Sequence, residues 1–217
     1  MGSLSLTTVI LITFGVVTAF HLFAGYFGRE KLRRITKVCL LPLLFCCYLL
    51  TAKTILVLVL LAAILGWGGD IFLIWIKKPV LFRFGLGCFL LGHLGYICSM
   101  LHFIETIHVT ALIISILIAL PAGIGAFVFI KPQNPMRFPT FCYIIVILSM
   151  SICAFQLLLF RLDPQSIIIF AGSIFFLISD TILGYSTFQS ASKHSNFYIM
   201  LPYILAQTCI LLGLAAC

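Results

Sequence analysis

Residues 54–76 read TILVLVLLAAILGWGGDIFLIWI, an apolar run in which Asp70 is the one charged residue. An α-helix needs about 20 predominantly apolar residues to cross the hydrocarbon core of a bilayer. This run is long enough, so it predicts a transmembrane helix that carries a carboxyl group inside the membrane.

Similar apolar runs occupy most of the chain. Of its 217 residues, 63% are hydrophobic and 8% are charged, whereas a soluble domain has roughly 25% charged residues. The polar residues are too few to cover a water-facing surface, which excludes a soluble globular domain. The net charge of +8 does not indicate nucleic-acid binding, because the basic residues lie in short gaps between apolar runs, where they set membrane topology.

The runs predict an all-α, polytopic membrane protein: one transmembrane domain over residues 1–217 with about eight helices. The second run is short and meets the third at a tight linker around Lys53, which predicts a helical hairpin. The first run has no basic stretch before it and leads into a basic loop, so we interpret it as a helix and not as a signal peptide. The expected helices lie at 4–27, 38–52, 54–76, 80–101, 109–130, 138–160, 166–187 and 197–216.

The basic residues predict the orientation of the chain. Cytoplasmic loops of membrane proteins carry an excess of Lys and Arg. Eleven of the thirteen basic residues fall in or beside the odd-numbered connections, and Lys53 and Arg161 are the exceptions. We therefore expect the odd-numbered connections on the cytoplasmic side and both termini on the opposite side. The eleven are Arg29, Lys31, Arg33, Arg34, Lys37, Lys77, Lys78, Arg83, Lys131, Arg137 and Lys193.

Two of the five acidic residues lie inside apolar runs. Glu30, Glu105 and Asp163 fall in loops or at helix ends, where a solvated charge is expected. Asp70 and Asp180 each lie about seven residues before the cytoplasmic end of a predicted helix, roughly 10 Å below the interface. A charged group at such a depth is costly unless it faces a partner or a wet cavity. The two residues could merely join neighbouring helices, but two carboxyls at matched depth are more than packing requires.

Two carboxyl groups that share a membrane cavity can act as one acid and one base near neutral pH, because like charges in one site do not both ionise readily. Further polar residues could complete such a site. His93 and Tyr96 share a helix face at i,i+3, as do Tyr203 and Gln207 at i,i+4. Taken singly, each is weak evidence, since a membrane His or Tyr often bonds a backbone carbonyl. The candidate binding residues are Lys37, His93, Tyr96, Tyr143, Ser179, Tyr203 and Gln207.

The sequence predicts no metal site and no cofactor. No second His lies within helical reach of His93, and the nine cysteines form no CxxC pair and no zinc-binding spacing with His. Buried cysteines behave as small apolar residues. Glycines at 66, 68, 69, 92 and 95 permit close helix approach. Asp70 and Asp180, each after a small residue, could reflect two parallel four-helix halves, but the similarity is too short to establish a repeat.

Several short motifs, in order along the chain, resemble the lysoplasmalogenase (YhhN-like) family of eight-helix membrane proteins. The resemblance covers almost the whole chain. The motifs are Lys37, Gly69-Asp70-Ile71-Phe72-Leu73, His93-Leu94-Gly95-Tyr96, Ser179-Asp180 with Phe188, and Tyr203 with Gln207.

The resemblance implies hydrolysis of the vinyl ether bond of lysoplasmalogens to a fatty aldehyde and glycerophosphoethanolamine or glycerophosphocholine. Some relatives lack the Asp of the seventh helix, whereas this chain keeps both carboxyls, which favours an active enzyme. We hypothesise that one Asp protonates the vinyl ether while the other stabilises the cation and activates water. Lys37 and nearby arginines would hold the phosphate, and His93, Tyr96, Tyr203 and Gln207 would position water and the glycerol hydroxyl. The sequence leaves open which Asp is the acid.

Three other classes of protein remain as alternatives: a proton- or cation-coupled transporter, a catalytically silent lysolipid-binding protein, and a metal-dependent membrane hydrolase. The expected partners are a lysophospholipid and the bilayer, with no nucleic acid. The expected location is the inner membrane of a bacterium or the endoplasmic reticulum of a eukaryote. Head-group preference and oligomeric state do not follow from the sequence.

Overall fold

The computed structural model describes residues 5–217 and contains eight helices and no strand within them, which confirms the all-helical prediction. Seven of the described helices are long and apolar enough to cross a membrane, and α3 is shorter, at 17 residues. The helices are α1 Leu6–Tyr26, α2 Glu30–Thr51, α3 Val57–Leu73, α4 Pro79–Leu101, α5 Val109–Ile130, α6 Arg137–Arg161, α7 Pro164–Phe188 and α8 Ser195–Ala216.

Local signals in the sequence set several helix ends. Gly28 adopts a φ of 68°, a left-handed conformation that glycine adopts without strain, between α1 and α2. Proline occupies the first position of α4 and of α7, where its missing N–H has no helical partner to lose. Asp163 caps α7 by accepting a hydrogen bond from the Ser166 backbone N–H, at 2.8 Å.

Two of the expected helices differ from the observed ones by three or more residues at an end. Helix α2 begins at Glu30 and not at residue 38, because the charged stretch before the apolar run is itself helical and pairs Glu30 with Arg33 one turn later. Lys37 therefore lies two turns inside α2, not at its opening. Helix α3 covers Val57–Leu73 and not 54–76, and turns occupy the residues between it and Pro79. The expected start of the first helix, Leu4, lies outside the described residues.

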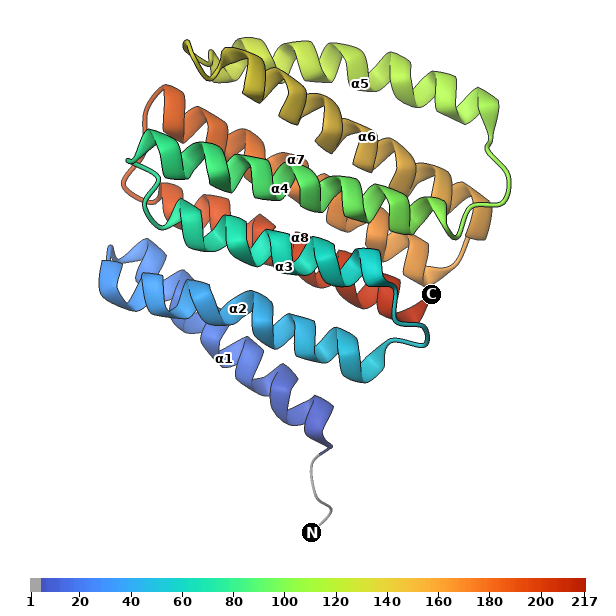
Figure 1. The fold of residues 1–217 in the computed structure, drawn as a ribbon, viewed down its shortest axis with the longest axis horizontal. Coiled ribbons are helices and arrows are strands. Elements are labelled where there is room, and N and C mark those ends of the chain that lie inside the picture. The colour runs from blue at the N-terminus through green and yellow to red at the C-terminus, as the bar shows by residue number, and fades with distance from the viewer. Residues whose placement is uncertain (1–4) are drawn as a thin grey trace.

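Six helices form a closed ring, and the other two lie outside it (Figure 1). Around the ring, α2 packs against α3, α3 against α4, α4 against α6, α6 against α7, α7 against α8, and α8 against α2. Helix α1 packs outside the ring on α2 and α8, and α5 packs outside it on α6 and α7, at opposite ends of the view. All nine candidate site residues belong to ring helices.

The contacts between helices repeat across the two halves of the chain. If α1–α4 are matched with α5–α8, the pair α2·α8 corresponds to α6·α4, and α3·α4 corresponds to α7·α8. Asp70 and Asp180 lie on the equivalent helices α3 and α7. The arrangement thus supports the internal repeat that the sequence only suggested. Two contacts break the match within the described residues: α1 packs on α8, whereas α5 and α4 have no comparable packing, and α5 packs on α7, whereas α1 and α3 have none.

Glycines let α3 and α4 approach each other closely. A Cβ atom at Gly92 would lie 3.2 Å from the Ala62 carbonyl oxygen, and one at Gly69 would lie 2.7 Å from the Phe89 ring. Gly95 is similarly crowded by α3, whereas Gly66 faces Leu41 of α2 and Gln207 of α8, and a Cβ at Gly68 would meet only the Cys88 sulfur, at 3.8 Å. Small residues thus hold Asp70 of α3 close to α4, as helix interfaces in membranes require.

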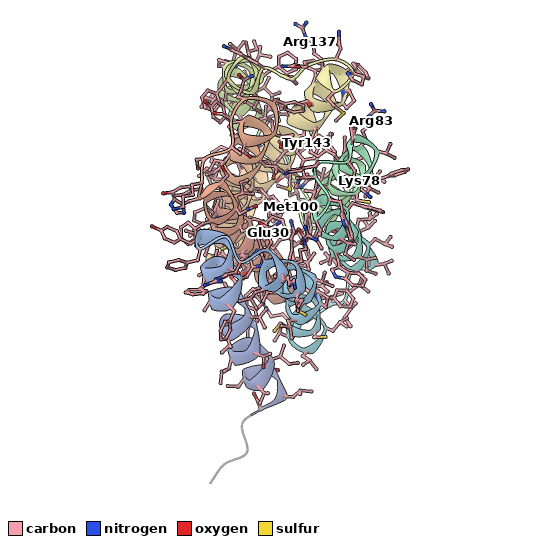
Figure 2. The ribbon with its side chains drawn as sticks, turned by 90° about the vertical axis from the view of Figure 1, so that its left-hand side faces the viewer. Glu30, Lys78, Arg83, Met100, Arg137 and Tyr143 are labelled. Carbon is pink, nitrogen blue, oxygen red and sulfur yellow. The ribbon has the colours of Figure 1, made fainter. Side chains whose placement is uncertain are left out.

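The four odd-numbered connections gather at one end of the bundle, and the start of α1 and the end of α8 lie at the other (Figure 1). Figure 2 views the molecule from the end that carries the odd-numbered connections. Glu30 and Lys78 lie near the middle of this face, and Arg83 and Arg137 lie towards its edge. We refer to this face as the basic end.

Candidate active site

A polar cavity of about 710 Å³ lies inside the ring and reaches the basic end. Its deep wall contains buried residues of α2, α3 and α8, namely Lys37, Asp70 and Tyr203, with Asp180 of α7 beside them. Its outer wall contains exposed residues of the connections, among them Lys77 and Lys78. The two membrane aspartates, 110 positions apart in the chain, therefore face one cavity.

Asp70 joins α3 to the helices on either side. The Lys37 ammonium of α2 lies 3.3 Å from Asp70 Oδ1, and both side chains are nearly inaccessible. From α8, the Tyr203 hydroxyl donates to Asp70 Oδ2 at 2.6 Å. The Gln207 amide donates to the Tyr203 hydroxyl at 3.5 Å, and the Tyr96 hydroxyl of α4 donates to the Gln207 carbonyl oxygen at 2.8 Å. The hydrogen bonds orient Asp70, and Lys37 supplies it with a cation.

Asp180 is held in the equivalent way by different residue types. The Tyr143 hydroxyl of α6 donates to Asp180 Oδ2 at 2.5 Å. His93 Nε2 of α4 lies 2.9 Å from the Tyr143 hydroxyl and 3.7 Å from Asp180 Oδ2. Since the tyrosine proton goes to Asp180, the Nε2 atom of His93 must donate to Tyr143. No lysine or arginine within the described residues forms an ion pair with Asp180.

The His93 ring is enclosed. Its Nδ1 atom is buried and has no hydrogen-bond partner in residues 5–217. Phe176 meets the ring edge to face, with centroids 4.8 Å apart. A second proton on Nδ1 would leave a buried, charged N–H without an acceptor, which costs more than an unpaired neutral nitrogen. The surroundings therefore favour a neutral imidazole that is protonated on Nε2.

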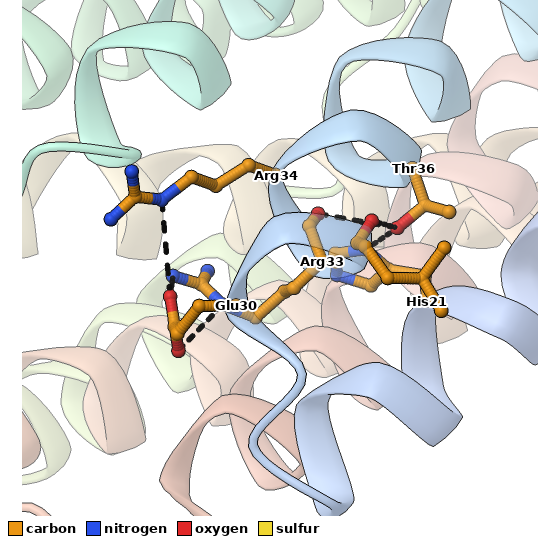
Figure 3. A network of polar contacts seen from close by, with 6 residues as sticks. His21, Glu30, Arg33, Arg34 and Thr36 are labelled. Carbon is orange, nitrogen blue, oxygen red and sulfur yellow. Dashed lines mark hydrogen bonds and ion pairs between the residues drawn. The ribbon is translucent and has the colours of Figure 1, made fainter.

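Basic residues surround the mouth of the cavity. Figure 3 shows Glu30 between two arginines of α2: it contacts Arg33 at 2.7 Å and Arg34 at 4.0 Å. The same view shows His21 of α1 beside Thr36, at 2.8 Å, which ties α1 to α2 behind the cavity. Lys77 and Lys78 form no ion pair in the described part of the chain. The mouth thus carries more positive than negative charge and suits an anionic group.

A model of the YhhN family matches residues 32–214. The chain belongs to the YhhN family. This confirms the family that the motifs indicated, and the matched range contains every candidate site residue from Lys37 to Gln207. No curated protein and no solved structure matches the chain.

In this YhhN-family chain, some candidate residues line the polar cavity or the pocket beside it, and the others lie behind them. Lys37, Asp70, Ser179, Asp180 and Tyr203 line the polar cavity. Tyr143 lines a smaller pocket on the other side of Asp180. His93, Tyr96 and Gln207 line neither space in the described structure. His93 contacts Tyr143 and Gln207 contacts Tyr203 from behind, and Tyr96 donates to Gln207.

Ser179 lines the cavity but is already engaged. Its hydroxyl donates to the Ile199 carbonyl of α8 at 3.0 Å, and the side chain is buried. The single hydroxyl proton is therefore committed to joining α7 to α8. This geometry favours a packing role for Ser179 over contact with a ligand.

The sequence did not single out several polar residues of the cavity wall. Ser192, from the connection before α8, and Asn196, in the first turn of α8, line the cavity together with Ser186 and Thr187 of α7. No local pattern distinguishes them, because their position depends on how α7 and α8 enclose the cavity. Within residues 5–217, no group of three His, Cys, Asp or Glu side chains is placed to hold a metal ion.

Proposed function

We propose that this YhhN-family protein is a lysoplasmalogenase that hydrolyses the vinyl ether bond of a lysophospholipid by acid–base chemistry between Asp70 and Asp180. The observation that carries the proposal is the placement of both membrane carboxyls on one cavity with a basic mouth. Vinyl ether hydrolysis requires a proton donor and a group that stabilises a cation and activates water. Two carboxyls in unlike surroundings can divide these roles.

The mouth of the cavity suits the phosphate of the substrate. Arg33, Arg34, Lys77 and Lys78 line it, and guanidinium and ammonium groups bind phosphate by charge-assisted hydrogen bonds. With the phosphate at the mouth, the glycerol extends inwards, towards Asp70 and Asp180. The vinyl ether bond between the glycerol and the alkenyl chain of the lipid then lies beside the two carboxyls.

Asp70 is the ionised partner in this mechanism. Burial disfavours a charge on Asp70, which is 1% exposed, but Lys37 supplies an opposite charge at 3.3 Å that favours the carboxylate. The Tyr203 hydroxyl also donates to Asp70, which stabilises the same form. Asp70 therefore stabilises the cationic intermediate and accepts the proton of water.

Asp180 is the acid. A neutral His93 gives it no cation, whereas Lys37 gives one to Asp70, and the apolar wall beside Asp180 favours the uncharged carboxyl. Its 14% exposed side chain faces the cavity, so its proton can reach a bound substrate. Tyr143 and His93 are positioning residues that hold the carboxyl in place.

The reaction balances with these two groups alone. Asp180 transfers its proton to the β carbon of the vinyl ether, which leaves an oxocarbenium ion opposite the Asp70 carboxylate. Water adds to the carbon that bears oxygen and gives its proton to Asp70, forming a hemiacetal. The hemiacetal hydroxyl then returns a proton to Asp180 while Asp70 protonates the leaving glycerol oxygen. The products are a fatty aldehyde and the glycerophospho alcohol, and both carboxyls regain their starting states.

The decisive experiment measures aldehyde release by the purified protein from vinyl-ether lysophosphoethanolamine and lysophosphocholine. The ester and saturated-ether analogues serve as comparison substrates. We expect aldehyde from the vinyl ethers alone. Asp70→Asn and Asp180→Asn should each lower kcat by at least about 100-fold, since a positioned acid or base contributes about 10²- to 10⁴-fold. Glu105→Gln, a carboxyl in the exposed loop before α5, should retain full activity.

Other outcomes would favour other classes of protein. Full aldehyde release by well-folded Asp70→Asn or Asp180→Asn would refute the two-carboxyl mechanism. Lysolipid binding without turnover would indicate a silent binding protein. Proton or cation flux in proteoliposomes without lipid turnover would indicate a transporter.

A further inference from the structure

A second pocket, of about 160 Å³, lies between α4, α5, α6 and α7. Its wall is almost entirely apolar, with Phe82 and Leu86 from α4, Ile144 and Leu148 from α6, and small residues from α5. The α5 residues are Ala122, Gly123, Ala126 and Ile130, so the helix contributes little side-chain volume to the wall except at its last residue. A lining of this kind binds hydrocarbon and not a polar ligand.

The apolar pocket and the polar cavity meet at Asp180. Both spaces are lined by Asp180, together with Leu73, Phe89 and Leu183. On one side of this carboxyl lie the lysines and arginines of the mouth, and on the other lies hydrocarbon. An amphiphile with a phosphate in the polar cavity can therefore place its chain in the apolar pocket only by passing Asp180.

The pocket lies where the two halves of the protein differ. In the first half, α1 packs on α8, whereas the equivalent helices α5 and α4 have no comparable packing among the described residues. Both α4 and α5 nevertheless line the pocket. The pocket thus separates α4 from α5. Because Ala122 of α5 is exposed and also lines the pocket, the pocket lies next to the surrounding lipid.

We propose that this pocket binds the part of the alkenyl chain nearest the vinyl ether, and that Ala126 on α5 keeps it open. The inference rests on the proposed function and extends it from the head group to the chain. An engineered apolar cavity of about 150 Å³ binds benzene, so this pocket takes roughly six carbons. The remainder of the chain leaves between α4 and α5 into the bilayer.

The test narrows the pocket from α5 and compares chains of different length. Ala126→Leu adds a branched side chain to the wall, and its matched control is Gly125→Leu. Gly125 is exposed, and a Cβ there would meet no described atom within 4 Å. Aldehyde release is measured for two vinyl-ether lysophosphocholines. The short one has a two-carbon alkenyl group, with no carbon beyond the vinyl ether, and the long one has a sixteen-carbon alkenyl chain.

We expect wild type to favour the long chain, since each buried CH₂ is worth about 0.8 kcal/mol, or about fourfold in kcat/KM. Ala126→Leu should lower kcat/KM for the long chain at least tenfold and leave that for the short chain within about twofold. Gly125→Leu should keep the wild-type ratio. An unchanged ratio in Ala126→Leu would overturn the proposal.

A binding readout separates this inference from the proposed reaction. A saturated-ether lysophosphocholine with a diazirine at the fourth chain carbon cannot be hydrolysed and labels what surrounds that carbon. Labelling of Ile144 or Leu148, lost in Ala126→Leu and kept in Gly125→Leu, would support the chain pocket even if no vinyl ether is cleaved. Labelling confined to residues outside the pocket would overturn it even if aldehyde is released. The same holds if wild-type labelling is no stronger without unlabelled lysolipid than with it as a competitor.

Discussion

Asp70 and Asp180 look alike in the sequence, but they have different neighbours. Asp70 receives a lysine and a tyrosine from α2 and α8, and Asp180 receives a tyrosine, backed by a histidine, from α6 and α4. The repeated framework places two carboxyls in equivalent positions, and the residue types around them make those positions chemically unequal. This difference is what allows one carboxyl to act as base and the other as acid.

At the residue scale, the Lys37–Asp70 pair should be strongly coupled. Lys37→Met leaves the buried carboxylate without its cation, so we expect a loss of about 3–5 kcal/mol in unfolding free energy. The double variant Lys37→Met/Asp70→Asn should be more stable than the sum of the single effects predicts, because it removes both charges. Denaturation of the four proteins in one detergent measures the coupling. Strict additivity would show that the two groups do not interact.

Tyr143 should affect turnover more than substrate affinity. Tyr143→Phe keeps the ring but removes the hydrogen bond to Asp180 and the acceptor for His93. We expect kcat to fall about 10- to 100-fold with KM nearly unchanged, because the acid is no longer held in place. His93→Gln in the Tyr143→Phe background should add little, since both act through the same carboxyl. A rise in KM at constant kcat would instead indicate direct substrate contact.

At the scale of the helices, close packing of α3 on α4 positions Asp70. A side chain at Gly92 must displace a backbone carbonyl, since its Cβ would lie 3.2 Å from the Ala62 oxygen. Gly92→Val should therefore cost about 1–3 kcal/mol and lower Tm. Gly87→Val, on the same helix, is the control, because a Cβ there would meet no described atom within 4 Å. Equal Tm values for the two variants would contradict this account.

The start of α7 provides a pH-dependent contribution outside the membrane. Burial raises the pKa of Asp163, but hydrogen bonds from Ser166 and the Arg161 side chain, at 2.7 Å, outweigh this and hold the pKa below its ordinary value. The folded state therefore favours the carboxylate. Its stabilisation is complete above the unfolded pKa of about 3.9 and is lost as the pH falls through the lower folded value.

Asp163→Asn isolates this charge, because asparagine is an equally good N-cap. We expect wild type to be more stable than Asp163→Asn near pH 6, with the difference in Tm shrinking below about pH 4. The measurement is thermal unfolding of both proteins between pH 3 and pH 7. A difference that stays constant over this range would exclude a role for the carboxylate.

At the scale of the whole molecule, the ring separates a basic end from the end that carries the C-terminus. The cavity reaches the basic end, so orientation decides which leaflet supplies the substrate. The positive-inside rule predicts that the basic end lies on the cytoplasmic side. We therefore expect a reporter fused to the C-terminus to be non-cytoplasmic, and a cysteine at Lys193 to react only with reagents that reach the cytoplasm. The opposite pattern would show that the cavity opens on the other side of the membrane.

The sequence by itself determined the class of protein, the eight helices, the excess of positive charge in the odd-numbered connections and the family. These follow from run length, charge and short motifs, which are properties of neighbouring residues. The apolar runs were less reliable at helix ends. They missed the first two turns of α2 because those turns are charged, and they lengthened α3 because apolar turn residues follow it.

Only the tertiary structure decided which residues share a space. Asp70 meets Tyr203, 133 positions away, and Asp180 meets Tyr143, 37 positions away. His93, Tyr96 and Gln207 lie behind the tyrosines, and the apolar pocket beside Asp180 depends on where α5 packs. These facts arise from contacts between distant helices, and the pattern along a single helix shows which of its faces is polar but not which helix packs against that face.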